Sequence, residues 1–578
     1  MHPTRELTIV AQDPKLRSGK KRKGPIVTAR VAVPNEDLDE GPRGARVFVI
    51  DYDATTKTLY APLGKEKYGT AERPVDPYGG ELSEATILGD PGFHAQNVYA
   101  LVMRTLGRFE QALGRRIGWG FRGHQLYVAP HAFGVANAYY SREDRALLFG
   151  YFEAPRGVGG GMVYSCLSHD VVVHETAHSL LDGLRERYQD PSSADQAAFH
   201  EGFADVVALL STFSLPEVMR AAFPERAVER TELKAEALRT GVLLTLAEEM
   251  GAAMNGVRGR ALRQSATIRP DRAILKKARY QEEHDRGEVF VAAMMLALVD
   301  VLEAGFESLG DRGPDGQAGQ GPLDRERVIQ EAAQTAGKLL TIAIRALDYC
   351  PAAHVTFGDY LSALLTADKE LVPYDGKYGF RAAIRKNFEA FGIDPASGKT
   401  GDGAWERPAE EGRGELDYST VHLRELQTDE EEVFRFVWAN RGGLGVDGHA
   451  YTRVLPVRPV RRQGPDGIVL EETVAQYVQI RTVRAEELGR LGIRKPEGMK
   501  DSVEVTLYGG GTLIFDEFGR LKFHVRNRID AAEQQSERLA HLFRSGAFDE
   551  AKGARKIGAL HLERQTPWPL GASAGEEK

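Results

Sequence analysis

Hydrophobic and polar positions alternate along the first part of the chain, as they do in β-strands with one buried face. The alternation runs through IVTARVAV (26–33) and ARVFVIDYD (45–53), and the turn-like ATTK separates the second run from TLYAPLG. A helical period follows over residues 94–113, and strand patterns return at 125–129 and 136–152. The first 150 residues therefore predict several strands and one long helix.

Helical periodicity dominates the middle of the chain. Residues 228–253, 287–308 and 324–347 each have the apolar spacing of an amphipathic or buried helix. The last two are separated by GDRGPDGQAGQGPLD, whose glycines and prolines indicate a surface connection. The middle of the chain thus predicts a helical region that follows the β-rich one.

Strand patterns reappear after a second Gly/Pro-rich linker at residues 394–415. They include HAYTRVLPVRPVRR, ETVAQYVQIRTV and SVEVTLY, while GGGTLIFDEFGRLKFHV predicts a hairpin that turns at residues 517–519. This last part carries no cluster of metal-binding or nucleophilic residues in its sequence pattern. We expect a structural or substrate-positioning domain of unknown role.

The stretch HETAH, residues 174–178, lies between the β-rich and helical regions in an apolar run that predicts a helix. Positions four apart share one helix face, so His174 and His178 can hold one metal ion, while Glu175 is rotated away by about 100 degrees. A second predicted helix, from about residue 193, carries Glu201 and Asp205, again four apart. Glu201 completes a His/His/Glu set with a fourth position open for water, which is typical of catalytic zinc. Asp205 is expected to accept a hydrogen bond from His174 and fix its tautomer.

Composition narrows the class of protein. The 578 residues are 42% hydrophobic and 27% charged, as in an ordinary soluble globular protein, and suggest two to four domains. A net charge of -8 gives no reason to expect a nucleic-acid partner. Cys166 and Cys350 are too few for a disulfide framework, although a single bridge between them stays open.

Targeting patterns are few. The N-terminal apolar run LTIVA is too short for the core of a signal peptide, so we expect a cytoplasmic protein, with export without a leader left open. The longest other apolar run, residues 289–299, falls short of the ~20 residues that span a bilayer. We therefore expect no membrane partner, and the sequence leaves the oligomeric state unknown.

HETAH followed by EGFAD has the HExxH plus ExxxD form of the gluzincin zinc metallopeptidases, and the chain most resembles thermolysin-like and fungalysin-like enzymes over residues 90–393. Matching segments occur in the right order: NAYY with Asn137 and Ala138, then the tyrosine Tyr188, then ALR with Arg263, then HDRGEVF with His284. The resemblance implies that Asn137 and Ala138 belong to an edge strand that holds the substrate backbone. It also implies that Arg263 binds a substrate carbonyl and that Tyr188 and His284 stabilise the transition state.

The resemblance implies an α+β, two-lobed zinc metallopeptidase fold, and the strand patterns after the second linker add a β-rich C-terminal domain. We expect these parts: a β-rich lead-in (1–90), an N-lobe with the HExxH helix (91–190), a helical C-lobe (191–393), a linker (394–415) and a C-terminal domain (416–578). The place equivalent to a calcium-binding glutamate of thermolysin lies near Thr212, and the acidic cluster that normally follows is absent. Structural calcium is therefore not expected.

The function predicted is a zinc-dependent metalloendopeptidase that cleaves peptide or protein substrates with a zinc-activated water and Glu175 as general base. Two alternatives stay open. A zinc aminopeptidase would keep the metal, but the sequence has no GxMEN-type stretch to hold a free amine. A non-catalytic interaction protein could retain the scaffold, although decay would not be expected to preserve Glu175 and all three ligands.

Overall fold

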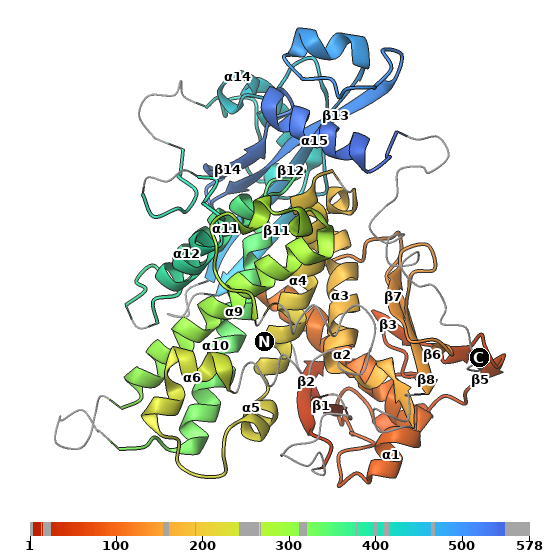
Figure 1. Ribbon diagram of the computed structural model, residues 1–578. Helices are drawn as coiled ribbons and strands as arrows, with labels where there is room; N and C mark the ends of the chain where they lie inside the picture. Colours follow the sequence, from red (N-terminus) through yellow and green to blue (C-terminus); the bar gives the residue numbers. More distant parts are fainter. Residues whose placement is uncertain are drawn as a thin grey trace, which may run out of the picture.

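The structure is a computed structural model of the whole chain. Its described residues are 4–12, 14, 25–153, 161–190, 192–241, 265, 267–310, 321–376, 378–397, 401–408, 416–463 and 469–548. The fold is mixed α and β, as the sequence predicts. Figure 1 shows one sheet beside helices α2 and α3, a group of long helices next to them, and a second sheet above.

The first sheet has the strand order β3-β6-β8-β7, and β9 also pairs with β8. Its strands are β3 (Val47–Val49), β6 (Leu126–Phe133), β7 (Ala138–Ser141), β8 (Ala146–Glu153) and β9 (Met162–Tyr164). β3, β6 and β8 run parallel, whereas β7 and β9 are antiparallel to β8. The strand pattern predicted at 136–152 is therefore a hairpin, and its first strand, β7, lies at the edge of the sheet.

Residues 1–90 do not form a unit separate from this sheet. β1 (Thr4–Val10) and β2 (Thr28–Pro34) form an antiparallel ribbon that packs on α2 (Pro91–Leu113), while β3 pairs directly with β6. The short hairpin of β4 (Tyr52–Asp53) and β5 (Thr58–Leu59) follows. The predicted lead-in thus contributes a strand to the sheet that also carries β7.

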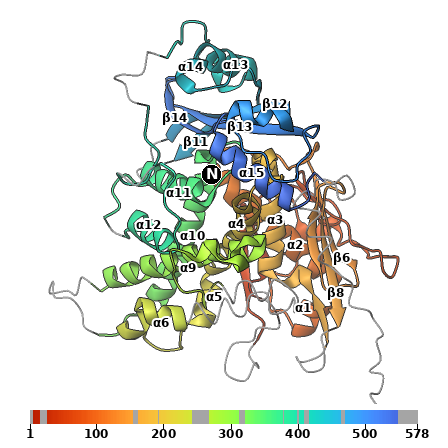
Figure 2. The same ribbon diagram turned by 45° about the horizontal axis from the view of Figure 1, so that its top comes forward.

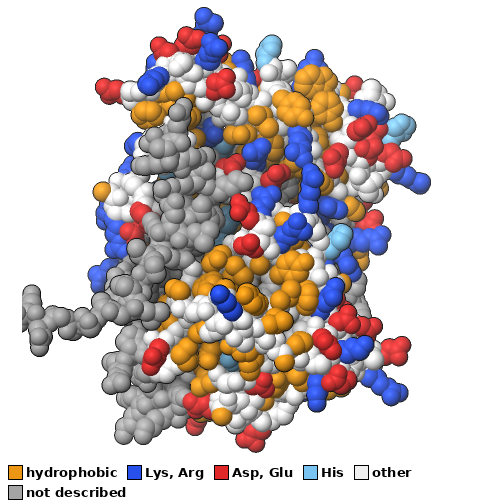
Figure 3. All heavy atoms as spheres, turned by 90° about the vertical axis from the view of Figure 1, so that its right-hand side faces the viewer, with side chains coloured by type: hydrophobic (Ala, Val, Ile, Leu, Met, Phe, Trp, Pro, Cys, Tyr) orange, Lys and Arg blue, Asp and Glu red, His pale blue; other side chains and the backbone are white. Residues whose placement is uncertain are grey.

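Hydrophobic side chains also remain on the outer surface of this part of the molecule. Figure 3 faces the side on which Figure 1 places β3 to β8, and hydrophobic side chains gather over its lower half. Exposed large apolar residues of these strands include Leu59 and Tyr127. Tyr127 belongs to the sheet and Leu59 to the β4–β5 hairpin, so part of this surface is apolar and is not covered by the described residues.

Helices α3 (His169–Leu184) and α4 (Ala194–Phe213) pack against each other in the centre of the chain. Around them lie α9 (Glu283–Ser308), α10 (Arg325–Ala346), α11 (Phe357–Leu371) and α12 (Phe380–Ala390), with the shorter α5 (Pro216–Ala222) and α6 (Ala235–Thr240) at the periphery. The helices predicted at 287–308 and 324–347 are confirmed. In the predicted helix at 228–253 the structure has the short η5 (Arg230–Leu233) and α6, and the rest lies outside the described residues.

Among the described helices, α9 alone is by itself long and apolar enough to cross a membrane, with a mean hydropathy of 2.1 over its most apolar window. α4 and α5 pass the same test only if they count as one span, although they are bent by 79°. Because 78% of the α9 window is buried against neighbouring helices, α9 has the surroundings of a core helix.

The C-terminal part contains an antiparallel sheet with the strand order β10-β12-β13-β14, in which β11 also pairs with β12. Its elements are β10 (Tyr451–Val454), β11 (Arg458–Gln463), β12 (Val469–Arg484), β13 (Glu504–Phe515) and β14 (Leu521–Asn527), with α13 (Glu430–Ala439), α14 (Arg441–Leu444) and α15 (Ala532–Arg544). The predicted hairpin is β13–β14. Figures 1 and 2 both show this sheet next to the helical region.

Contacts join the C-terminal sheet to the rest of the protein. Val460, Val474 and Phe523 belong to the same hydrophobic core as the central helices. The Thr512 hydroxyl donates to the backbone carbonyl of Cys350 at 2.7 Å. Both cysteines are buried free thiols, so the disulfide left open by the sequence is not formed.

Candidate metal centre

The HETAH stretch is helical, because it lies within α3, and its two histidines share one face. His174 and His178 are both nearly fully buried, and their Nε2 atoms are 2.8 Å apart. Their ring centroids are 4.5 Å apart with the planes at 85°. The i, i+4 spacing has therefore directed two ring nitrogens to one point.

Packing of α4 against α3 brings the third group. Oε2 of Glu201 is 3.8 Å from Nε2 of His174, and Oε1 is 3.7 Å from Nε2 of His178. One donor atom from each residue lies within 4.8 Å of the other two, and all three residues are buried. We call these three residues the candidate metal centre, because the group can hold a metal ion.

Asp205 orients His174, as its spacing from Glu201 predicts. Nδ1 of His174 lies 2.7 Å from Oδ1 of Asp205. A carboxylate accepts hydrogen bonds, so Nδ1 carries the proton and Nε2 presents its lone pair towards His178. The donor set, two imidazoles and a carboxylate with an acceptor behind one imidazole, fits a divalent metal such as zinc.

Replacing Asp205 by asparagine is expected to lower metal affinity by about 10- to 100-fold, because the carboxylate that holds the His174 tautomer is lost. The measurement is competition of the full-length protein with a chelator of known affinity. Asp300→Asn is the control, since Asp300 pairs with Lys386 away from the centre. Equal affinity of the Asp205 variant and the control would contradict this role of Asp205.

Glu175 lies beside the centre and its position is fixed by the sheet. It is 1% exposed, and its Oε2 accepts a hydrogen bond of 3.0 Å from the backbone N–H of Tyr140 in β7. Residue patterns cannot predict this contact, because every residue except proline supplies a backbone N–H donor. The link joins the predicted general base on α3 to an edge strand.

Edge strand β7 presents its outer backbone groups on the side of Glu175. The carbonyl of Asn137 accepts from Gly150 N on β8, and Tyr139 is the next residue in register that faces β8. Because alternate residues of an antiparallel strand face opposite sides, the backbone groups of Ala138 and Tyr140 point away from β8. Ala138 thus lies in an edge strand and Asn137 directly precedes it, while their binding of a substrate backbone stays a prediction.

His284 is also brought to the centre, by the first turn of α9. Its Nε2 is 3.9 Å from Oε2 of Glu201, and its Nδ1 is 3.2 Å from Oε1 of Glu282. Its side chain is 25% exposed, more than those of the three candidate ligands. His284 is therefore placed to reach a group bound next to Glu201.

Glu288 of α9 is an acidic side chain that is buried near Asp205. Burial, followed by the negative charge of Asp285, raises the pKa of Glu288 to about 8. Glu288 consequently retains its proton near neutral pH. It does not add a full negative charge beside Asp205.

Two predicted residues do not join this group of contacts. Tyr188 is fully buried, and its hydroxyl donates to the backbone carbonyl of Pro351 at 2.7 Å. These contacts give Tyr188 a packing role in the core, so its predicted role in the transition state gains no support. Arg263 lies outside the described residues.

His200 and Asp182 support His178, which the sequence did not indicate. The His200 ring stacks on His178 with a centroid distance of 4.6 Å and a 10° angle between planes. Nε2 of His200 is 3.3 Å from Oδ1 of Asp182, one helical turn beyond His178 on α3. The stack restricts rotation of the His178 ring.

No protein-family model matches the chain, and a search of curated proteins finds no similar one.

Proposed function

We propose that the protein is a zinc-dependent metalloendopeptidase of the gluzincin class. The observation that carries the proposal is the convergence of His174, His178 and Glu201 beside a glutamate held against an edge strand. A metal site alone would be compatible with many functions. A buried carboxylate next to it, fixed by the strand that a peptide would join, favours peptide hydrolysis.

Zinc is the proposed ion, because two imidazoles and one carboxylate with an open position are typical of hydrolytic zinc sites. When bound, it would supply a Lewis acid that polarises a carbonyl and activates water. His174 is supported by Asp205 and His178 by the stacked His200, so both imidazoles are preorganised. Calcium is not part of the proposal.

Glu175 is the proposed general base. Its carboxylate takes a proton from the attacking water and gives it to the departing amine. The N–H of Tyr140 holds one carboxylate oxygen, which keeps the group from rotating away from the reacting atoms. His284, next to Glu201, is the proposed donor to the developing oxyanion.

The substrate is proposed to bind as an extended peptide along β7. An extended chain can add to a sheet edge through backbone hydrogen bonds, and the outward groups of Ala138 are available by position for such pairing. The proposal includes a two-lobed, thermolysin-like cleft. The sheet with β7 would be one wall of the cleft, and the helical region with His284 the other.

Cleavage of blocked peptides tests the proposed function. The full-length protein, incubated with a library of peptides blocked at the N-terminus, is expected to cut internal bonds. A chelator should abolish cleavage and zinc should restore it, as mass spectrometry of the products would show. Cleavage of free-amine peptides only would make the protein an aminopeptidase, and failure to cleave either set with zinc bound would favour a non-catalytic interaction protein.

A further inference from the structure

A second group of metal-binding side chains lies outside the candidate metal centre. It consists of His94 on α2, His131 on β6 and Cys166 on the short helix η3 (Ser165–Leu167), and we call it the His94 cluster. One donor atom of each residue lies within 4.8 Å of the other two. The exposed fractions are 1%, 3% and 0%, so these polar groups are shielded from solvent.

The hydrogen bonds of the two histidines define their tautomers. Nε2 of His94 lies 2.9 Å from the carbonyl oxygen of Ile87, and Nδ1 of His131 lies 2.8 Å from Oδ2 of Asp51. Carbonyl and carboxylate oxygens accept, so these two nitrogens carry the protons. The remaining nitrogens, Nδ1 of His94 and Nε2 of His131, then present lone pairs to each other at 2.8 Å.

Two facing lone pairs require a cation between them. A shared proton is one such cation, with His131 as an imidazolium beside the Asp51 carboxylate. A proton would leave the Cys166 thiol without a role in the cluster. A metal ion uses all three donors.

The same arrangement occurs at the candidate metal centre. Asp205 supports His174 there as Asp51 supports His131 here, and in both places the facing ring nitrogens are 2.8 Å apart. Tetrahedral zinc with bonds of about 2.0–2.1 Å would separate two nitrogens by about 3.3 Å. The rings of the His94 cluster need to part by about 0.5 Å.

We propose that the His94 cluster binds a second zinc ion, independent of the candidate metal centre. Imidazole and thiolate ligands select zinc over magnesium and calcium, which prefer oxygen. Asp51 holds His131 in the ligating tautomer and accepts a second bond, 3.1 Å long, from the His131 backbone N–H. Binding converts the Cys166 thiol to a thiolate and releases its proton to solvent.

The second ion would connect three parts of the fold. Cys166 lies three residues before the first residue of α3, and the cluster ties this point to α2 and to the sheet. The side chain of Asn97 on α2 already donates to the Cys166 carbonyl at 2.8 Å. The ion therefore fixes the start of the helix that carries His174 and His178.

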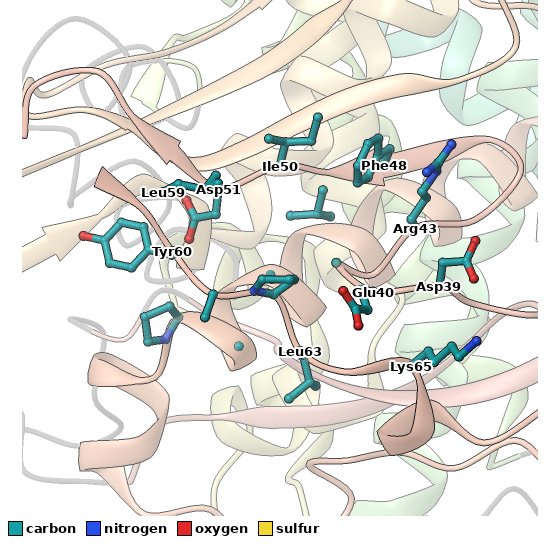
Figure 4. Close-up of a pocket in the computed structure, with 17 residues that line it drawn as sticks. Asp39, Glu40, Arg43, Phe48, Ile50, Asp51, Leu59, Tyr60, Leu63 and Lys65 are labelled. Carbon is teal, nitrogen blue, oxygen red and sulfur yellow. The ribbon is translucent and has the colours of Figure 1, made fainter. Parts of the chain in front are cut away.

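A pocket of about 460 Å³ reaches the edge of the cluster. Figure 4 shows Asp51 and Tyr60 at one end of this pocket and Asp39, Arg43 and Lys65 at the other. The Tyr60 ring lies 5.0 Å from the His131 ring. Asp51 and Tyr60 line the pocket, and both contact His131.

Cobalt substitution tests the proposal, because a cobalt–thiolate bond gives a charge-transfer absorption in the near ultraviolet and the candidate metal centre has no sulfur ligand. The full-length protein, stripped with a chelator and titrated with Co²⁺, is expected to show this band. Cys166→Ser should lose it, whereas Cys350→Ser, which removes the other buried thiol, should keep it. Zinc analysis should give two ions per chain for wild type and one for Cys166→Ser.

His178→Ala separates this proposal from the proposed function, since it should lose peptidase activity but keep the cobalt–thiolate band. Absence of the band in wild-type protein saturated with cobalt would overturn the proposal, whether or not any variant folds. It would mean that a proton joins His94 and His131. A band that persists in Cys166→Ser would overturn it equally.

Discussion

Replacing Glu175 by glutamine is expected to lower peptide cleavage by about 100- to 10,000-fold, the range that a general base contributes. Glutamine has the shape of glutamate, and its amide oxygen can still accept the hydrogen bond from Tyr140 N–H. Its amide cannot take a proton from water at neutral pH. The loss is therefore expected in kcat, as initial rates on one cleaved peptide would show.

The zinc content of Glu175→Gln separates a catalytic effect from a structural one. It should equal that of the wild type, because Glu175 is not among the three candidate ligands. Glu331→Gln is the matched control, a buried glutamate on α10 whose Oε1 accepts from Thr335 within the same helix. A Glu175→Gln rate within about tenfold of the wild type, with zinc retained, would remove Glu175 from the role of general base.

The candidate metal centre could be predicted because its signals are local. The i, i+4 spacings of His174 with His178 and of Glu201 with Asp205 follow from helix geometry alone. The structure then adds only the packing of α3 on α4, which brings the two faces together. The bond from Asp205 to His174 follows from the same periodicity.

The His94 cluster had no such signal. Its members are 37 and 35 residues apart, in a helix, a strand and a 3-10 helix, and only tertiary packing brings them together. The contact of the Tyr140 backbone N–H could not be predicted either, because any residue except proline supplies such a donor. Residue patterns therefore do not predict a site that is assembled from distant elements. They also do not predict which backbone groups contribute to a site.

The predicted domain boundaries rest on changes in composition along the chain, and strand pairing crosses one of them. Residues 47–49 fall within the predicted lead-in, yet they pair in parallel with β6, and parallel pairing needs a distant partner that alternation cannot identify. Tyr188 shows the same limit for a single residue. The resemblance placed it by its spacing from the motif, whereas its hydroxyl contacts a carbonyl 163 residues away.

A buried charge network joins the C-terminal sheet to the rest of the protein. Asp348, in the short helix η8 (Leu347–Tyr349), accepts two hydrogen bonds from Arg115, of 2.5 and 2.7 Å, and also pairs with Arg462 of β11. Arg462 continues the network to Glu472 of β12 at 2.6 Å. One carboxylate thus connects three parts of the chain that are distant in sequence.

The network makes the free energy of unfolding depend on pH. Burial alone would raise the pKa of Asp348, but Arg115 and then Arg462 lower it to about 2, below the usual value of 3.8. Since the folded pKa is the lower one, ionised Asp348 stabilises the fold above pH 3.8, and this contribution is lost as the pH falls towards 2. The shift corresponds to about 2 kcal/mol.

Replacing Asp348 by alanine is expected to lower the free energy of unfolding by about 3–5 kcal/mol, because two buried guanidinium groups lose their shared counter-charge. Urea unfolding followed by tryptophan fluorescence measures the change, and the indole N–H of Trp405 donates to the neighbouring Tyr349 carbonyl. Asp530→Asn is the control, since its pair with Arg528 is about half exposed and is expected to contribute less than about 1 kcal/mol. An Asp348 variant as stable as this control would show that apolar packing alone, through residues such as Val460 and Phe523, holds the C-terminal sheet in place.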